Sequence, residues 1–299
     1  CGCGETRFQG EKTKCEEDTS TGYLVRDNEK CILCRRCVAV CKKVQEVAVI
    51  APARRGFNTH IACAFESDLA DAPCVACGQC VAVCPTGALH EREEIDNVRD
   101  AINNPEKVVV VAAAPAVRAA IGEEFGYPIG TNTEGKMFTA MRMLGFDKVF
   151  DVNFSADLTI MEEANELIDR VSNKGVLPMF TSCSPGWIRF VEYYYPELIP
   201  NLSSCKSPMQ MFGATVKTYW AQKEGIDPKN IYVVGIMPCT AKKFEKTRAD
   251  ENASGYPDID AVLTTRELAK MIKTSGIIFN ELPDGTFDNP LGEFTGAGV

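Results

Sequence analysis

The chain has 299 residues, enough for two domains or for one large domain with an appendage. Its net charge of −9 and its pI of about 5.0 argue against nucleic acid or an anionic membrane as a partner. Apolar runs are much shorter than the ~18 residues of a membrane-spanning helix. The first residues, CGCGETRFQG, lack the pattern of a signal peptide. We therefore expect a cytoplasmic protein without a membrane span.

Cysteine is the unusual feature of the composition, with 15 residues, most of them near the amino terminus. Disulfide scaffolds of this density are usually short secreted chains, so metal binding is the better interpretation. Only His60 and His90 could supply imidazole, which argues against histidine-based zinc or iron sites.

Two cysteine runs share the spacing C-x2-C-x2-C-x3-C, and the second ends in a proline, Pro85. This spacing is that of bacterial two-cluster ferredoxins, in which the fourth cysteine of each run ligates the other cluster. We therefore predict two crossed ligand sets for two 4Fe-4S clusters. The first quartet is Cys31, Cys34, Cys37 and Cys84, and the second quartet is Cys74, Cys77, Cys80 and Cys41. Separate zinc sites are the alternative, but they do not explain two crossed and matched sets.

Four further cysteines lie near these runs. Cys1 and Cys3 are either the remnant of a further cluster-binding segment or free thiols, and the role of Cys15 is open. Cys63 lies in the apolar stretch HIACAF, where a buried free cysteine is expected.

From about Asn104 the sequence alternates between short apolar runs and segments of helical composition. This alternation predicts a mostly parallel sheet covered by helices on both faces. The expected strands are 107–115, 148–153, 176–183 and 230–239, and the expected helices include 116–126, 134–146, 155–175, 187–199 and 207–225.

Pro115, Cys183 and Cys239 each follow one of these expected strands. Ligands of open α/β sheets bind beyond the carboxyl ends of the strands. We therefore expect the two cysteines to converge on one site. The alternative is a pair of unrelated buried cysteines.

Several motifs make the chain resemble the catalytic subunit of iron-only (FeFe) hydrogenases over almost its whole length. They are ADLTIMEEANEL, FTSCSPGW, NLSSCKSP, IMPCTAKKFE and DIDAVLTTRELAKMIK. The resemblance implies the H-cluster, a 4Fe-4S cubane joined to a two-iron centre, which interconverts H2 with protons and electrons. It also implies a linker or remnant over 1–25, a ferredoxin-like α+β domain over 26–100 that conducts electrons, and part of a hydrogenase-type α/β domain over 101–299.

The resemblance assigns roles to two motifs. It makes Cys183 the proton donor beside the two-iron centre and Cys239 a cubane ligand. It places Lys242 near a cyanide and Met237 in the same cofactor-binding motif. At the position of another cubane ligand stands Ser184.

The family's proton path matches Glu163, Ser203 and Glu166, with Arg170 near its outer end. Independently, the spacing of Glu163, Glu166 and Arg170 places them on one face of a helix. Without the resemblance, these three residues would be interpreted as a solvated stripe.

Two departures from the family bear on catalysis. A serine hydroxyl, as in Ser184, is harder and less acidic than a thiol, and is therefore a poor ligand for iron–sulfur. The family's third motif, with two more cubane cysteines, is absent from the printed sequence, which leaves Cys239 alone. We expect that the chain as printed does not hold the H-cluster.

Three functions remain open. The chain could belong to a hydrogenase, with protons and H2 as reactants and a ferredoxin or a flavin- or NAD(P)-linked subunit as redox partner. It could be a non-catalytic electron-transfer subunit of a larger redox complex. A third, weaker hypothesis is an iron–sulfur assembly factor.

Overall fold

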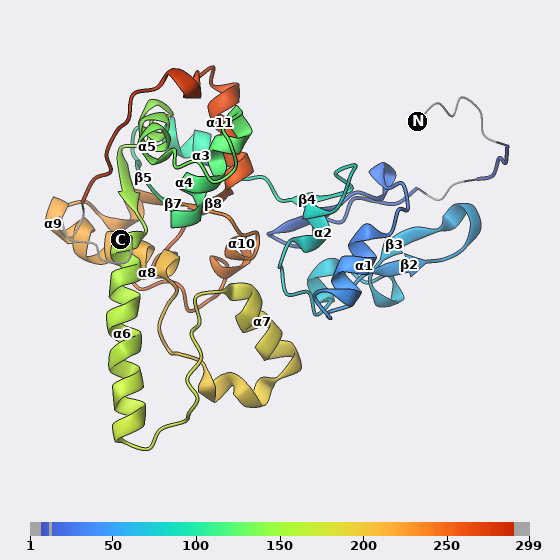
Figure 1. The fold of residues 1–299 in the computed structure, drawn as a ribbon, viewed down its shortest axis with the longest axis horizontal. Coiled ribbons are helices and arrows are strands. Elements are labelled where there is room, and N and C mark those ends of the chain that lie inside the picture. The colour runs from blue at the N-terminus through green and yellow to red at the C-terminus, as the bar shows by residue number, and fades with distance from the viewer. Residues whose placement is uncertain (1–6, 12–13, 290–299) are drawn as a thin grey trace. The chain divides into compact units, whose positions relative to one another are not determined.

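The computed structural model describes residues 7–11 and 14–289, which form two compact units that divide between Arg92 and Glu93 (Figure 1). The first unit combines short helices and antiparallel strands. The second is an α/β unit built on a parallel sheet. The predicted fold class is therefore confirmed.

Very short elements make up the first unit. Its strands form two antiparallel pairs, β1 with β4 and β2 with β3. The elements are β1 (Leu24–Arg26), α1 (Arg36–Lys43), β2 (Ala51–Ala53), β3 (His60–Ala62), α2 (Gln79–Ala82) and β4 (Leu89–Glu91). Small domains that bind metal commonly depend on it for part of their folding stability.

The second unit contains a four-stranded parallel sheet with the order β6-β5-β7-β8. Its strands are β5 (Val108–Ala113), β6 (Lys148–Asp151), β7 (Ile231–Met237) and β8 (Ala261–Thr264). In β5, one of the two inner strands, Val111 pairs with Val149 of β6 on one side and with Val234 of β7 on the other. Three of the four predicted strands are therefore confirmed, and β8 lies ahead of the last helix.

Both faces of this sheet are buried, as the continuous apolar runs predict. Val109 and Val111 point into one core, whereas Val110 and Ala112 point into the other, where Phe212 packs. The first core is closed by α3 (Ile95–Ile102), α4 (Pro115–Ala120), α5 (Glu134–Met143) and α11 (Thr265–Thr274), and the second by α8 (Pro208–Thr215).

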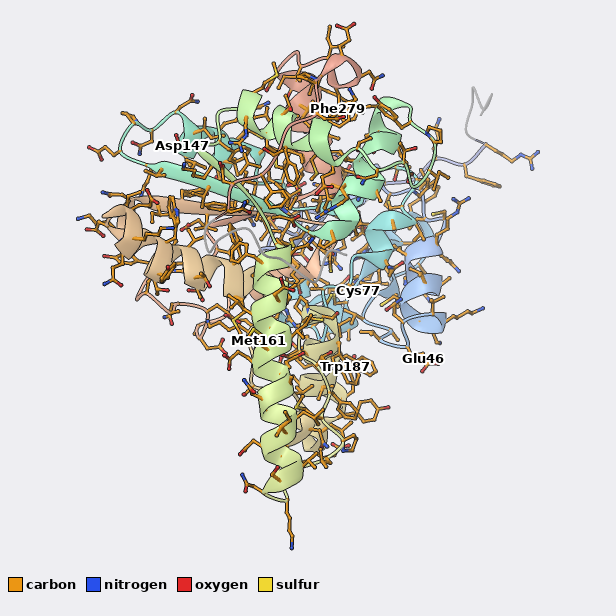
Figure 2. The ribbon with its side chains drawn as sticks, turned by 60° about the vertical axis from the view of Figure 1, so that its left-hand side comes forward. Glu46, Cys77, Asp147, Met161, Trp187 and Phe279 are labelled. Carbon is orange, nitrogen blue, oxygen red and sulfur yellow. The ribbon has the colours of Figure 1, made fainter. Side chains whose placement is uncertain are left out.

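Helix α6 (Asn153–Ser172) has a buried first turn, and its later turns are largely exposed. Met161, labelled in Figure 2, is one of several exposed apolar side chains on these turns. Glu163, Glu166 and Arg170 are partly buried while their immediate neighbours are exposed, so they share one face, as their spacing predicts.

The predicted strand at 176–183 is wrong. This segment forms only an isolated bridge between Phe180 and Leu202. Pro178 lies in the middle of the apolar run and has no amide N–H to donate to a sheet. The predicted helix that follows is α7 (Pro185–Tyr194), which continues into a 3-10 turn at Pro196–Asn201.

The predicted helix at 207–225 is divided in three. Helix α8 is followed by one π-helical turn, Val216–Trp220, and then by α9 (Ala221–Glu224). A short helix, α10 (Ala241–Glu245), follows β7. Within 7–11 and 14–289, each helix is too short or too polar to cross a bilayer.

Candidate functional sites

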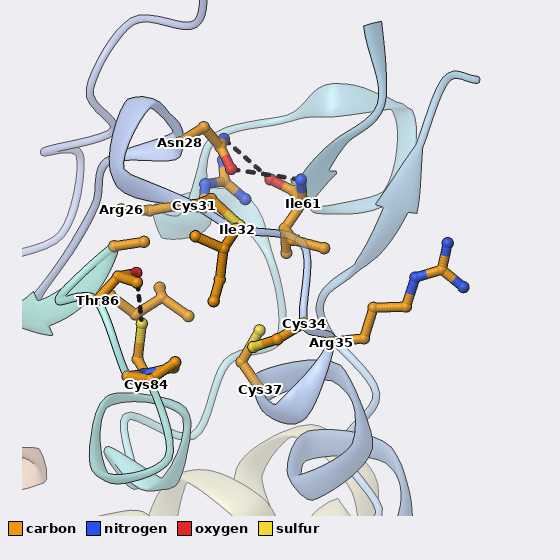
Figure 3. A pocket seen from close by; sticks show the side chains of 13 residues that line it. Arg26, Asn28, Cys31, Ile32, Cys34, Arg35, Cys37, Ile61, Cys84 and Thr86 are labelled. Carbon is orange, nitrogen blue, oxygen red and sulfur yellow. Dashed lines mark hydrogen bonds between the residues drawn. The ribbon is translucent and has the colours of Figure 1, made fainter. Parts of the chain in front are cut away.

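The two predicted quartets line two different pockets of the first unit. Cys31, Cys34, Cys37 and Cys84 line one pocket (Figure 3). Cys41, Cys74, Cys77 and Cys80 line the other. The structure therefore brings the cysteines together in the crossed pattern that the two-cluster spacing predicts, with the last cysteine of each run beside the first three of the other.

The backbone of the two runs repeats the same unusual turn. Leu33 and Arg35 have positive φ angles of 55° and 61°, and the equivalent Ala76 and Gly78 have φ angles of 58° and 73°. Left-handed residues reverse the direction of the backbone amides, and successive N–H groups then make an anion-binding concavity. In the first run, the Leu33 N–H lies 3.4 Å from Cys31 Sγ. This turn suits thiolates that ligate iron.

The quartet thiols have unequal environments. Burial, with a smaller contribution from the neighbouring thiols Cys31 and Cys84, raises the pKa of Cys37 to about 11. Burial likewise raises the pKa of Cys80. Both thiols therefore carry protons at neutral pH unless iron displaces them, and iron binding releases those protons.

The donor chemistry fits two iron–sulfur clusters, since soft thiolates are their usual ligands. The four thiols of each quartet line the walls of one pocket. Thiolates also bind zinc, and metal analysis separates the two alternatives.

The remaining cysteines of the first unit differ in exposure. Cys63 is buried and free, as predicted, and accepts a hydrogen bond from Arg26. The Cys15 N–H donates to Glu29 at 3.3 Å. Cys1 and Cys3 lie outside the described residues.

In the second unit, Lys242 connects the two cysteine motifs that the resemblance singles out. Its Nζ donates to the carbonyl oxygen of Cys183 at 2.9 Å, and its backbone N–H donates to the carbonyl oxygen of Cys239 at 3.3 Å. Cys239 follows β7 and precedes α10, whereas Cys183 precedes α7. The two motifs therefore converge on one site, although Cys183 does not follow a strand.

Lys242 is held by a buried ion pair. Its Nζ lies 2.8 Å from the carboxylate of Glu245, one helical turn further on, and 2.9 Å from Ser207 Oγ. Ser207 Oγ also donates to Glu245 at 2.9 Å, and it caps α8. All three side chains are nearly inaccessible, so their positions are strongly fixed.

The other residues of the two motifs have different surroundings. Cys183 and Ser184 are exposed, and the Ser184 side chain makes no capping hydrogen bond at the start of α7. Met237 is buried in the core between β7 and α8. Its side chain thus packs within the scaffold of the site.

Glu166 is the centre of a polar cluster at α6. It accepts hydrogen bonds from Ser203 Oγ at 3.1 Å, from Arg170 Nε at 3.0 Å and from the Ser204 N–H at 3.0 Å. Burial raises the pKa of Glu166, but the hydrogen bonds from Ser204, Arg170 and Ser203 outweigh burial and hold that pKa below its ordinary value. This carboxylate is therefore ionised at neutral pH.

Glu163 lies one turn before Glu166 but outside this cluster. Its buried Oε1 has no hydrogen-bond partner among the described residues. The structure therefore joins Ser203, Glu166 and Arg170 directly, and Glu163 stands apart from them.

A cavity of about 560 Å³ lies beside these groups, lined in part by Ser203, Ser207 and Glu245. Ser182 Oγ donates to the carbonyl oxygen of Cys205 at 2.7 Å and so ties the Cys183 segment to this wall. Sequence reasoning missed Ser182, Ser204, Cys205, Ser207 and Glu245. For Glu245 the only available signal is its i,i+3 spacing from Lys242.

The residues present do not make a complete H-cluster site. The structure places one cubane thiolate of the family pattern, Cys239, near the Cys183 segment, and a serine hydroxyl at Ser184. A cubane needs four ligands, which are normally thiolates. Of these four ligands, the printed chain supplies one thiolate, Cys239.

Comparison with known proteins supports both units. Residues 107–299 match the family model "Iron only hydrogenase large subunit, C-terminal domain", and residues 30–88 match "4Fe-4S dicluster domain".

Two hydrogenases among the curated relatives match almost the whole chain. It is 51% identical over 294 residues to the NADP-reducing hydrogenase subunit HndD of Solidesulfovibrio fructosivorans, covering 96% of this chain and 50% of the relative. It is 52% identical over 289 residues to iron hydrogenase 1 of Clostridium pasteurianum, covering 97% and 50%. A cytosolic Fe-S cluster assembly factor of Danio rerio is 35% identical over 200 residues, covering 63% and 48%.

A solved structure agrees with these relatives. A variant of apo FeFe-hydrogenase from Chlamydomonas reinhardtii superposes with a TM-score of 0.64 at 45% identity, covering 70% of this chain and 54% of that one. The chain spans about half the length of the curated relatives HndD and iron hydrogenase 1. With its crossed cysteine quartets and its Cys183–Lys242–Cys239 site, the chain belongs to the iron-only hydrogenase large-subunit family, with a 4Fe-4S dicluster domain.

Proposed function

We propose that the first unit relays electrons through two 4Fe-4S clusters to a hydrogenase-type domain. The observation that carries this proposal is the crossed arrangement of the quartets, because two matched sets of soft ligands suit two neighbouring cubanes. The first quartet would ligate one cluster and the second quartet the other.

The roles of residues in the second unit are proposals as well. Lys242 positions the Cys183 segment and presents its ammonium group to the site, while Cys239 ligates iron. Glu166, hydrogen-bonded to Ser203 and Arg170, holds a negative charge on the proposed proton path. Glu163, with its unpartnered buried oxygen, is the group from which Glu166 would receive a proton.

Reversible H2 oxidation is proposed for the whole protein rather than for the printed chain alone. The printed chain supplies Cys239 and, in place of a second thiolate, Ser184. Hydroxyls bind iron–sulfur poorly, so the H-cluster would need ligands that this chain does not provide.

The redox partner is proposed from one relative. HndD is named as a subunit of an NADP-reducing hydrogenase, so a nicotinamide-linked subunit, a flavin subunit or a ferredoxin would exchange electrons with the first unit. We propose a cytoplasmic location for the protein, which cell fractionation would test.

Iron content and paramagnetic resonance test the relay. An anaerobically prepared chain should bind about 8 iron atoms and show two cubane signals after reduction. Cys34→Ser should remove or alter one signal and lower the iron content, whereas the matched control Cys205→Ser should change neither. Low iron in the unmodified chain without any cubane signal would refute the proposal.

Ser184 favours a second candidate, a non-catalytic electron-transfer subunit. Infrared spectroscopy after treatment with the hydrogenase maturation system separates the two functions, because an H-cluster carries CO and cyanide ligands. Their bands, together with H2 production, would support the enzyme; cubane signals without such bands would support the electron carrier. Transfer of cubanes to an apoprotein would instead favour the assembly factor.

A further inference from the structure

Arg26 is a buried cation in the wall of the first-quartet pocket. It lies on β1, and its side chain is only 9% exposed. It lines the pocket together with Cys31 and Cys84 (Figure 3). Among the described residues, its buried Nε has no hydrogen-bond partner. An unpaired donor on a buried guanidinium is costly, so this residue needs a compensating role.

The two other nitrogens of Arg26 fix its orientation. Nη2 forms an ion pair with Asp18 at 2.8 Å, and Nη1 donates to Cys63 Sγ at 3.6 Å. Asp18 is itself held by the Leu69 N–H at 3.0 Å. Asp18 does not line the pocket, so the positive partner of the ion pair faces the quartet more closely than the negative one.

The second-quartet pocket has no counterpart of Arg26. Its described lining consists of neutral side chains and the four cysteines. Besides the cysteines, these residues are Leu24, Gln45, Val47, Val49, Val75, Gly78 and Gln79. The two sites therefore match in ligands and backbone but differ in charge.

Arg35, the other cation of the first pocket, differs from Arg26. It is exposed, and in Figure 3 its guanidinium extends away from the cysteines. Water screens a charge in that position much more strongly than a buried one.

We propose that Arg26 makes the two clusters unequal, so that the cluster on the first quartet is reduced before the cluster on the second. This inference rests on the proposed function of the two quartets. Reduction adds one negative charge to a cluster, and a buried positive charge beside it stabilises the reduced form. Electrons would then reside on the first cluster when the chain holds one electron.

The test is an anaerobic redox titration of the complete chain, followed by paramagnetic resonance. In Arg26→Met, the ratio of reduced to oxidised first cluster at a fixed potential should fall about tenfold, with a smaller change at the second cluster. Arg26→Lys should largely restore the ratio. Asp18→Asn removes the opposing charge and should raise the ratio. Arg35→Met is the matched control and should leave both clusters unchanged.

Cys34→Ser identifies which signal belongs to the first quartet. The inference would be overturned if the ratio of reduced to oxidised form changed for the second cluster alone, or equally for both clusters. Changes of the same sign in Arg26→Met and Asp18→Asn would also overturn it. If Arg26→Met binds too little iron, the ratios measured in Asp18→Asn and Arg26→Lys still test the inference. If Arg26→Met binds its full iron content and shows no selective change in the first cluster, this inference alone is refuted. If the unmodified chain shows no cubane signals, the proposed function itself is refuted.

Discussion

Replacing Lys242 by methionine should destabilise the second unit strongly. Methionine keeps the aliphatic volume of the side chain but removes an ammonium group that lies 2.8 Å from Glu245 and 2.9 Å from the Cys183 carbonyl oxygen. The lysine and glutamate side chains are only 11% and 6% exposed, so the substitution leaves a buried carboxylate without its counter-charge.

Breaking a buried ion pair on one side costs about 3–5 kcal/mol. We expect the lower end, about 3 kcal/mol, because Ser207 still donates one hydrogen bond to Glu245. For a unit of this size, that loss lowers Tm by about 6–12 °C.

Tryptophan fluorescence during denaturant unfolding measures this loss, because both tryptophans, Trp187 and Trp220, lie in the second unit. The exposed Lys223 provides a control, since Lys223→Met should change the free energy of unfolding by no more than about 0.5 kcal/mol.

The effects of substitutions at Lys242 and Glu245 on the free energy of unfolding should also be coupled. Lys242→Met/Glu245→Leu replaces the pair by apolar groups and should lie within about 1 kcal/mol of the unmodified chain. Additive single losses in the double variant would show that Lys242 and Glu245 are not coupled as a buried ion pair.

Three further predictions concern the other sites. Glu166→Gln should lower the free energy of unfolding at pH 7. The difference from the unmodified chain should shrink as the pH falls below about 4.3, because Glu166, with its depressed pKa, stabilises the fold only while its carboxylate is ionised. Chemical denaturation at a series of pH values measures this difference, and a difference that stays constant with pH would contradict the prediction. Removal of iron by a chelator and an oxidant should reduce the helical circular dichroism of the first unit and leave the tryptophan-reported transition of the second unit unchanged; simultaneous loss of both would contradict the division into two units. Cluster assembly should release protons and become weaker at lower pH, since Cys37 has a raised pKa; a proton-release measurement in weak buffer checks this, and assembly without proton release would exclude it.

The cysteine quartets could be predicted from the sequence because their geometry is local. Three thiols of each run come from seven consecutive residues, and the turn between them is set by short-range backbone angles at positions such as Leu33 and Ala76. The shared face of Glu166 and Arg170 on α6 could be predicted for the same reason, because helical periodicity places these residues together. Its partial burial could not, because the spacing alone indicates a solvated stripe.

The segment 176–183 could not be predicted in this way. Its apolar composition indicates a strand, but Pro178 removes a donor, and the segment is held instead by two backbone hydrogen bonds of Phe180, to Asn201 and from Ser203. These partners lie more than twenty positions away in the chain, and no local pattern identifies them. The contact of Lys242 with Cys183 is likewise a tertiary one, 59 positions apart.

The contacts that align the two cysteine motifs involve neither thiol. Lys242 binds the carbonyl oxygens of Cys183 and Cys239, and the Ser182 hydroxyl binds the Cys205 carbonyl oxygen. The exposed side chain of Ser184 makes no capping hydrogen bond. Because backbone carbonyls are the same in every residue, a change between serine and cysteine at position 184 alters the ligand chemistry but leaves the scaffold intact. The arrangement of the site and its capacity to bind iron are therefore separable properties of this chain.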